Sequence, residues 1–426
     1  MLYQILKPIV KYAIRVFFKK TYFYQPAPLP TDKPMILACN HPSGFIEPLI
    51  LTTHLPIALH SITRGDMFAK PMIRRILESL HMIPIFRFVD GYSSLKNNQA
   101  TFEKIYQVLD ENKAILIFAE GRTIWEKRLR PIQKGTARMV FGANDIYHKE
   151  EILIVPVGIN YTDITKFRSD VMVSFGEPLR MSDYLELYNE NNNKAITKMT
   201  ADISAAMAKE LIIIDKVEDE PLVEKLFEIY RNDLAEGILP IFEQSNDRLH
   251  DEKHIAQCIN EMPENEKLLF STKVDSYFEQ LQEAKITDYA LVNPPSHRIW
   301  SYLVIIIGFL PFILGYIINY IPYKIGKRTA DTKVKSISFY APVAFSVGLL
   351  IYLIQFLIIL IILTIFLGWH GLLWATMLPV WSYFSLVYKE YFVRTRKSNA
   401  LRRLNEAEIF SLRKLRFSIS SKINQN

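Results

Sequence analysis

The chain contains only two cysteines, Cys39 and Cys258, among its 426 residues. They stand far apart in apolar or helical contexts, so no disulfide is expected, and a reducing compartment is the simplest interpretation. The histidines His54, His60 and His81 lack the carboxylate or cysteine spacing of a metal site, so no metal is expected. No basic and aromatic RNA-reading motif is visible, which argues against nucleic acid as a partner.

The N-terminal residues lack the short apolar core and small-residue cleavage site of a signal peptide. Apolar residues recur there at helical spacing instead, with basic residues among them. This pattern predicts an amphipathic helix within residues 1–25 that lies in the membrane interface. A helix packed on the domain itself would show the same pattern, so that alternative stays open. The positions are Leu2, Ile5, Leu6, Ile9, Ala13, Val16 and Phe17, and Lys7, Lys11, Arg15, Lys19 and Lys20.

Half of the residues are hydrophobic, the formal net charge is +7 and the pI is near 9.0. The positive charge fits an anionic membrane surface, a phosphate-bearing substrate or an acidic carrier protein. The length exceeds that of a usual single domain, so a core domain with additional parts is expected.

Strand-like and helical runs alternate over residues 33–183, which predicts an α/β domain with helices on the faces of a sheet. In such folds ligands gather at the loops beyond the carboxyl ends of the strands. The expected strands are Met35–Cys39, Ala58–Thr63, Met82–Phe88, Ala114–Phe118, Ile152–Ile159 and Val171–Phe175.

A histidine, His41, directly follows the first of these strands, and a carboxylate, Glu47, stands six residues later. An imidazole in this setting can take a proton from a substrate hydroxyl, while the carboxylate orients the ring and stabilises the imidazolium. No serine or cysteine elbow accompanies the pair, so the attacking hydroxyl is expected to belong to the substrate. A structural role for a histidine beside a proline is the alternative.

Four blocks in a fixed order resemble the glycerolipid acyltransferase family, that is, the PlsC-like 1-acylglycerol-3-phosphate and glycerol-3-phosphate acyltransferases. Each block alone is a weak signal, and their order makes the match strong. The blocks are Asn40–Glu47, Ile83–Arg87, preceded by Arg64–Phe68, then Phe118–Thr123, and Ile154–Gly158 with the trailing Val173–Pro178.

The resemblance implies a mixed sheet flanked by helices, with a catalytic domain at residues 33–183. It implies transfer of a fatty acyl group from a thioester of coenzyme A or acyl carrier protein to glycerol 3-phosphate or lysophosphatidate, without a cofactor. His41 and Glu47 would be catalytic. The substrate-binding residues would be Arg87, Glu120, Gly121, Arg122 and Lys134.

Two departures from the family pattern keep other functions open. Glu47 stands where the family has aspartate, and glutamate costs more rotamer freedom to fix. Arg122 directly follows Gly121, whereas many members carry this arginine one place later. The alternatives are acylation of another lipid, such as a lysophospholipid or an amino-acid lipid, and a non-catalytic lipid-binding protein on the same scaffold.

The C-terminal half is expected to hold a helical appendage at residues 184–296, membrane segments at 297–392 and a basic cytoplasmic tail at 393–426. Basic residues precede the second membrane segment and follow the third. They place these two ends, and the catalytic domain with them, in the cytoplasm. An integral protein of the cell membrane follows. The first segment would then re-enter, with a bend near Gly308, Pro311 and Gly315, and a full crossing stays the alternative. The segments are Trp300–Pro322, Ala341–Leu367 and Gly371–Tyr388, each near the length that a bilayer requires.

Overall fold

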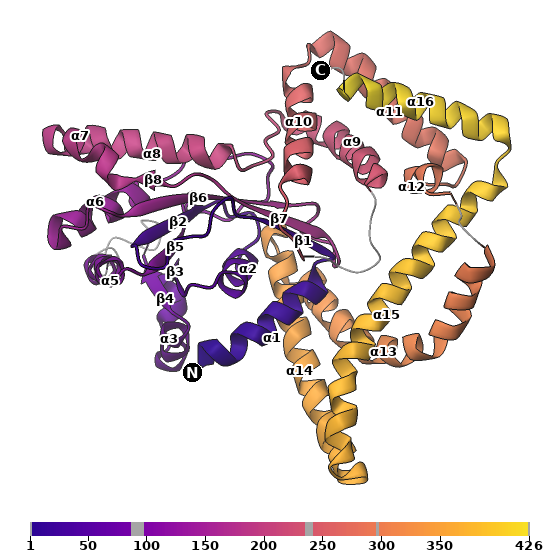
Figure 1. Ribbon diagram of the computed structural model, residues 1–426, viewed down its shortest axis with the longest axis horizontal. Coiled ribbons are helices and arrows are strands. Elements are labelled where there is room, and N and C mark those ends of the chain that lie inside the picture. The colour runs from indigo at the N-terminus through magenta and orange to yellow at the C-terminus, as the bar shows by residue number, and fades with distance from the viewer. Residues whose placement is uncertain (1, 87–97, 235–241, 295–297, 425–426) are drawn as a thin grey trace. The chain divides into compact units, whose positions relative to one another are not determined.

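The computed structural model describes residues 2–86, 98–234, 242–294 and 298–424 (Figure 1). By its internal contacts the chain divides into two compact units. Unit 1 consists of Met1–Ile212, Phe242–Asn246 and Val334–Pro342, and unit 2 contains the remaining residues.

Unit 1 is built on a nine-stranded sheet with the order β4-β3-β5-β2-β6-β7-β1-β9, and β8 pairs with β6 off this path. The β6–β7 and β6–β8 pairs are antiparallel and the other pairs are parallel. The expected mixed α/β sheet is therefore confirmed. The strands are β1 Lys20–Tyr24, β2 Met35–Cys39, β3 Leu59–Arg64, β4 Met82–Ile85, β5 Ala114–Phe118, β6 Leu153–Tyr161, β7 Asp170–Phe175, β8 Leu179–Arg180 and β9 Phe242–Glu243.

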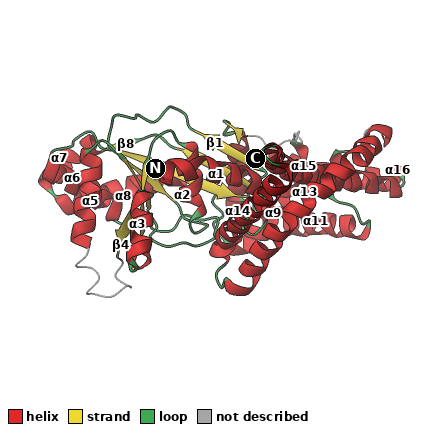
Figure 2. Cartoon of the chain, turned by 90° about the horizontal axis from the view of Figure 1, so that it is seen from below, coloured by secondary structure: helices red, strands yellow, loops and turns green. Residues whose placement is uncertain are grey.

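Helices cover both faces of this sheet, as Figures 1 and 2 show. The central strands are apolar along their whole length, as expected of parallel strands that are buried on both sides. One face packs on α5, α6 and α8 in a single hydrophobic cluster, and α1 and α2 lie on the other. The helices of unit 1 are α1 Leu2–Phe17, α2 Ile46–His54, α3 Pro71–Ser79, α5 Asn98–Asp110, α6 Gly135–Tyr147, α7 Leu185–Glu190 and α8 Asn192–Ala208.

The compact unit continues past residue 183, where the sequence placed the end of the catalytic domain. The reason is the apolar side of α8, because Ala195, Met199, Ile203 and Met207 are fully buried in the same cluster as the sheet. A mostly polar helix with one narrow apolar stripe still packs on a domain core, and composition alone did not reveal this.

The N-terminal helix is shorter than expected, since α1 ends at Phe17 and β1 begins at Lys20. Threonine and aromatic residues favour a strand there, and β1 pairs with β7 and β9. Part of α1 packs on the domain, with Ile14 and Phe17 buried and Lys7 Nζ donating to the carbonyl of Leu55 at 2.8 Å.

Unit 2 is helical, and buried ion pairs join several of its helices. Glu252 is buried between Arg231 and Arg248, with Nε–Oε1 distances of 2.8 and 3.0 Å. Arg416 binds Asp288 at 2.8 Å, so the basic tail is a packed helix. The helices are α9 Glu220–Asp233, α10 Asp247–Glu261, α11 Glu264–Glu283, α12 Asp288–Val292, α13 Arg298–Lys333, α14 Tyr340–Leu367, whose first residues belong to unit 1, α15 His370–Ala400 and α16 Glu406–Asn424.

Within the described part of the chain, two helical segments, Ile299–Lys333 and Ile337–Leu367, are long and apolar enough to cross a membrane. The third expected segment lies in α15 and is not among them, because tryptophan, tyrosine and serine side chains dilute its apolar residues.

The helix α13 runs from Arg298 to Lys333 without a break in its assignment and holds Pro311 and Pro322 in its interior, so whether it re-enters or crosses stays a prediction. Its glycines also permit close packing on α15, since a Cβ at Gly315 would stand 2.1 Å from the carbonyl oxygen of Trp381.

Candidate active site

The His41 turn and the Glu120 turn meet at one edge of the sheet. Strands β2 and β5 are parallel neighbours with Cys39 opposite Phe118 in the register, so their carboxyl ends coincide. The next strand, β6, fixes the first turn, because the amide of Asn40 exchanges two hydrogen bonds of 2.9 and 2.8 Å with the backbone of Ile159. The structure therefore brings His41 and Glu120 together at this edge, and their role as one substrate site stays a prediction.

His41 is oriented by Glu47. Its Nδ1 lies 3.2 Å from Oε2 of Glu47, and its ring is stacked on Phe118 with centroids 3.8 Å apart. With Nδ1 engaged by a carboxylate, the ring presents Nε2 as the atom that can accept a proton. The His41 side chain is 16% exposed, so a substrate can reach it.

Glu47 is fully buried, with 0% of its side chain exposed. An unpaired carboxylate at such a position would be costly. Its Oε1 accepts hydrogen bonds from the backbone N–H of Ser43 at 2.6 Å and from the hydroxyl of Tyr161 at 3.2 Å. Three donors therefore hold this carboxylate, and the extra methylene of glutamate spans the distance between them.

Tyr161 is the residue of this site that sequence analysis missed. It is the last residue of β6, and in the sequence nothing distinguishes it from another apolar strand position. Because its ring is buried, its hydroxyl needs a hydrogen-bond partner inside the protein. Burial raises the pKa of Tyr161 well above its usual value, and the negative charge of Glu47 adds to this. Tyr161 thus stays a neutral donor to Glu47.

Glu120 joins the two turns. Its Oε1 accepts the backbone N–H of His41 at 3.3 Å. Burial raises the pKa of Glu120, although backbone N–H groups and the charges of His41 and Arg130 act in the opposite direction. Gly121 has φ +69°, a left-handed conformation that glycine adopts without strain. Glu120 therefore fixes the backbone of His41 through this hydrogen bond.

The three predicted substrate-binding cations differ in how the structure places them relative to the His41 turn. Arg122 is exposed beside the site and has no ion-pair or hydrogen-bond partner among the residues that the structure describes. Lys134 is directed to α8, where its Nζ donates to Thr197 Oγ1 at 2.9 Å. Arg87 lies outside the described residues.

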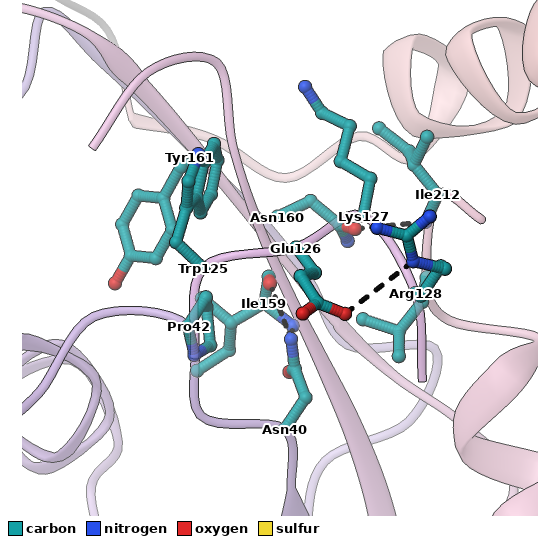
Figure 3. A pocket seen from close by; sticks show the side chains of 11 residues that line it. Asn40, Pro42, Trp125, Glu126, Lys127, Arg128, Ile159, Asn160, Tyr161 and Ile212 are labelled. Carbon is teal, nitrogen blue, oxygen red and sulfur yellow. Dashed lines mark hydrogen bonds and ion pairs between the residues drawn. The ribbon is translucent and has the colours of Figure 1, made fainter. Parts of the chain in front are cut away.

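A pocket next to the His41 turn carries further cations (Figure 3). Lys127 and Arg128 line it, and Arg128 Nε lies 3.5 Å from Glu126. Arg130 also pairs with Glu126, and these two arginines lower the pKa of Glu126 despite its partial burial. The other lining residues are Asn40, Pro42, Trp125, Ile159, Asn160, Tyr161, Leu211 and Ile212.

Gly44, in the turn between His41 and Glu47, cannot be replaced without strain. It has φ +47°, and a Cβ there would stand 3.0 Å from Pro342 Cγ and 3.1 Å from Phe339 Cδ1. We expect Gly44→Ala to lower the free energy of unfolding by about 1–2 kcal/mol, the cost of a left-handed conformation for a residue with a Cβ. Denaturant unfolding of the purified protein measures this change.

The matched control is Gly135→Ala at the start of α6, where a Cβ meets nothing within 4 Å. We expect this variant to be neutral or slightly stabilised. Equal stability of the two variants would contradict the strain at Gly44.

The segment that holds both turns of the site is similar to known proteins. Residues 20–160 match the family model described as Acyltransferase. These residues form an acyltransferase-family domain. The matched segment runs from the start of β1 to the residue before the end of β6, and it contains both turns of the site.

The acyltransferase domain is similar to curated proteins of that activity. Glycerol-3-phosphate O-acyltransferase 1 of Saccharomyces cerevisiae is 26% identical over 37% of this chain, which spans 21% of the yeast protein. Glycerol-3-phosphate O-acyltransferase 2 of the same organism is 28% identical over 27% of this chain and 16% of its own length. The chain thus spans less than a quarter of these relatives.

A bacterial relative matches over most of its own length. The 1-acyl-sn-glycerol-3-phosphate acyltransferase of Bacillus subtilis is 26% identical over 41% of this chain and 81% of its own length. The crystal structure of PlsC from Thermotoga maritima matches at 17% identity with a TM-score of 0.31, over 47% of this chain and 80% of that chain.

Proposed function

We propose that this chain is a membrane-bound acyltransferase that moves a fatty acyl group from an acyl thioester to a hydroxyl of glycerol 3-phosphate or lysophosphatidate in phospholipid synthesis. The observation that carries this proposal is the His41–Glu47 pair at the strand edge, inside the segment that matches the acyltransferase family. The donor is a thioester of coenzyme A or of acyl carrier protein.

The reaction needs one proton acceptor and a fixed attack geometry. His41 Nε2 removes the hydroxyl proton as the oxygen attacks the thioester carbonyl, while Glu47 stabilises the imidazolium. The tetrahedral intermediate then expels the thiolate, which takes the proton back from His41, so that an ester and a free thiol result. Holding both substrates in place supplies much of the remaining rate enhancement.

Purified protein in detergent, with labelled acyl thioester and candidate acceptors, tests this function. We expect a labelled lipid product with glycerol 3-phosphate or lysophosphatidate, and much less with a lysophospholipid or an amino-acid lipid. A preference for either of the latter would replace the proposed acceptor. A folded protein inactive with all acceptors and both donors would favour a non-catalytic lipid-binding role.

Arg122 is the exposed cation nearest in sequence to Glu120, and we propose that it binds the acceptor's phosphate through its planar fork. Arg122→Ala is expected to raise the KM for phosphate acceptors about 10- to 100-fold, the worth of a charge-assisted hydrogen bond. Steady-state kinetics with both acceptors measures it.

The control is Arg180→Ala, because Arg180 pairs with Leu153 at the amino end of β6, the opposite edge of the sheet. Its KM is expected to stay unchanged. An equal rise of KM in both variants would show a general charge effect instead of a phosphate contact.

The amino acids flanking the apolar helices support a cytoplasmic site. Basic residues precede the segment Ala341–Leu367 and follow the segment Gly371–Tyr388; they are Lys324, Lys327, Arg328, Lys333 and Lys335, and Lys389, Arg394, Arg396 and Lys397. By the positive-inside rule we propose that both of these ends, and the acyltransferase domain, face the cytoplasm.

A further inference from the structure

The segment after β3 presents apolar side chains to solvent. The short 3-10 helix η1, Gly65–Phe68, is fixed by an ion pair between Arg64 and Asp66 and by the buried ring of Phe68. Its neighbour Met67 points outward and is 49% exposed. The segment Arg64–Phe68 was singled out by the sequence, and neither turn of the active site uses it.

The following helix, α3, continues this surface. Only Leu77 of its nine residues is buried, whereas Met72 is 73% exposed and Ile73 and Ile76 are also exposed. Four large apolar side chains on thirteen residues are more than scattered surface hydrophobic residues, and such patches mark a protein or membrane contact.

Basic side chains accompany the apolar ones. Arg74 and Arg75 are exposed on the same helix, and Lys70, directly before it, is exposed as well. An apolar stripe with cations beside it is the pattern of a helix that lies in a lipid interface. A second copy of this chain would bring these like charges together, which is unfavourable.

The start of α1 extends the surface. The ring of Tyr3 lies 4.8 Å from that of His81, two residues beyond the end of α3, so the two helices are neighbours within unit 1. Leu2 and Ile5 of α1 are exposed as well. In the same unit, Gly44 contacts Phe339 and Pro342, which lie at the start of the apolar segment Ile337–Leu367.

We propose that η1 and α3, together with the first turns of α1, form a docking surface that inserts into the interfacial region of an anionic bilayer. Met67, Met72, Ile73 and Ile76 enter the lipid, and Lys70, Arg74 and Arg75 bind lipid phosphates. The surface holds the acyltransferase domain against the membrane independently of the apolar helices. It does not depend on the proposed reaction.

A fluorescent label at position 72 tests the docking surface in the full-length protein. Met72→Cys can be labelled selectively with an environment-sensitive thiol dye because Cys39 and Cys258 are buried. In vesicles of phosphatidylcholine and phosphatidylglycerol we expect a blue shift of the emission and quenching by lipids spin-labelled near the headgroup. Both signals should weaken when phosphatidylglycerol is omitted or when Arg74 and Arg75 are replaced by glutamate.

The matched control is Glu78→Cys, an exposed polar position on the same helix. It should show neither shift nor quenching. Unquenched, water-like emission at position 72, or equal quenching at both positions, would overturn the proposal. Energy transfer between differently labelled copies, without lipid quenching, would assign the surface to self-association instead. Acyl-transfer activity is not a readout here, so failure of the docking surface leaves the proposed function standing.

Discussion

Replacing His41 with alanine is expected to lower kcat for acyl transfer about 10²- to 10⁴-fold, the range contributed by a general base. The ring is fixed on both sides, by Glu47 at Nδ1 and by Phe118 through stacking. No other histidine is placed at this strand edge in the described part of the chain. The measurement is the single-turnover rate with saturating acyl thioester and acceptor.

A suitable control is His60→Ala, which removes a histidine from the opposite edge of the sheet, at the amino ends of the parallel strands. His60 Nδ1 lies 3.3 Å from the carbonyl of Ala114 at the start of β5, and burial lowers the pKa of His60 to about 4, so it is neutral at pH 7. This variant should keep its turnover if it remains folded. Comparable turnover in a folded His41→Ala variant would reject the general-base assignment.

The central strands could be predicted from the sequence because they are short apolar runs between turn signals. Met35–Cys39 and Ala114–Phe118 have the expected bounds, and each is buried on both faces of the sheet. The strand β1 could not be predicted, because its consecutive aromatic residues, Tyr22 to Tyr24, follow an amphipathic helix without a break. Its pairing with β7, which lies 150 residues away, decides its structure.

The candidate site also has features that could be predicted from the sequence and features that could not. The meeting of His41 and Glu120 could be predicted, because the carboxyl ends of parallel strands share one edge. The bond from Glu120 to the His41 backbone and the bond from Tyr161 to Glu47 could not. Both depend on the side chains that three different strands bring into contact, which local patterns do not encode. The direction of Lys134 toward Thr197 depends likewise on the packing of α8.

For the membrane segments, composition is sufficient to predict the apolar helices but not how these helices pack on one another. Long apolar runs predicted α13 and α14. The glycines of α13 were interpreted as a place for a bend, and in the structure Gly308 and Gly315 also give room to Tyr388 and Trp381 of α15. A glycine in an apolar helix permits either a bend or close packing, and only the neighbouring helix decides between them.

Replacing Glu47 with glutamine is expected to lower kcat by a similar factor of about 10²–10⁴, although the side chain keeps its size. The hydroxyl of Tyr161 and the N–H of Ser43 both donate to Oε1, so the glutamine oxygen takes that position. Its amide nitrogen then faces His41 Nδ1 and donates to it. The imidazole proton is thereby moved to Nε2, which can no longer accept one from the acceptor hydroxyl.

Glu47→Asp separates this charge and tautomer effect from the fit of the side chain. Aspartate keeps the negative charge, so the correct tautomer of His41 remains favoured. It is one methylene shorter, so it cannot reach both His41 and Tyr161 with the present geometry. The aspartate variant should therefore retain more activity than the glutamine variant in the same acyl-transfer assay. If glutamine were tolerated better than aspartate, Glu47 would act through packing alone, and the orientation of His41 by a carboxylate would be wrong.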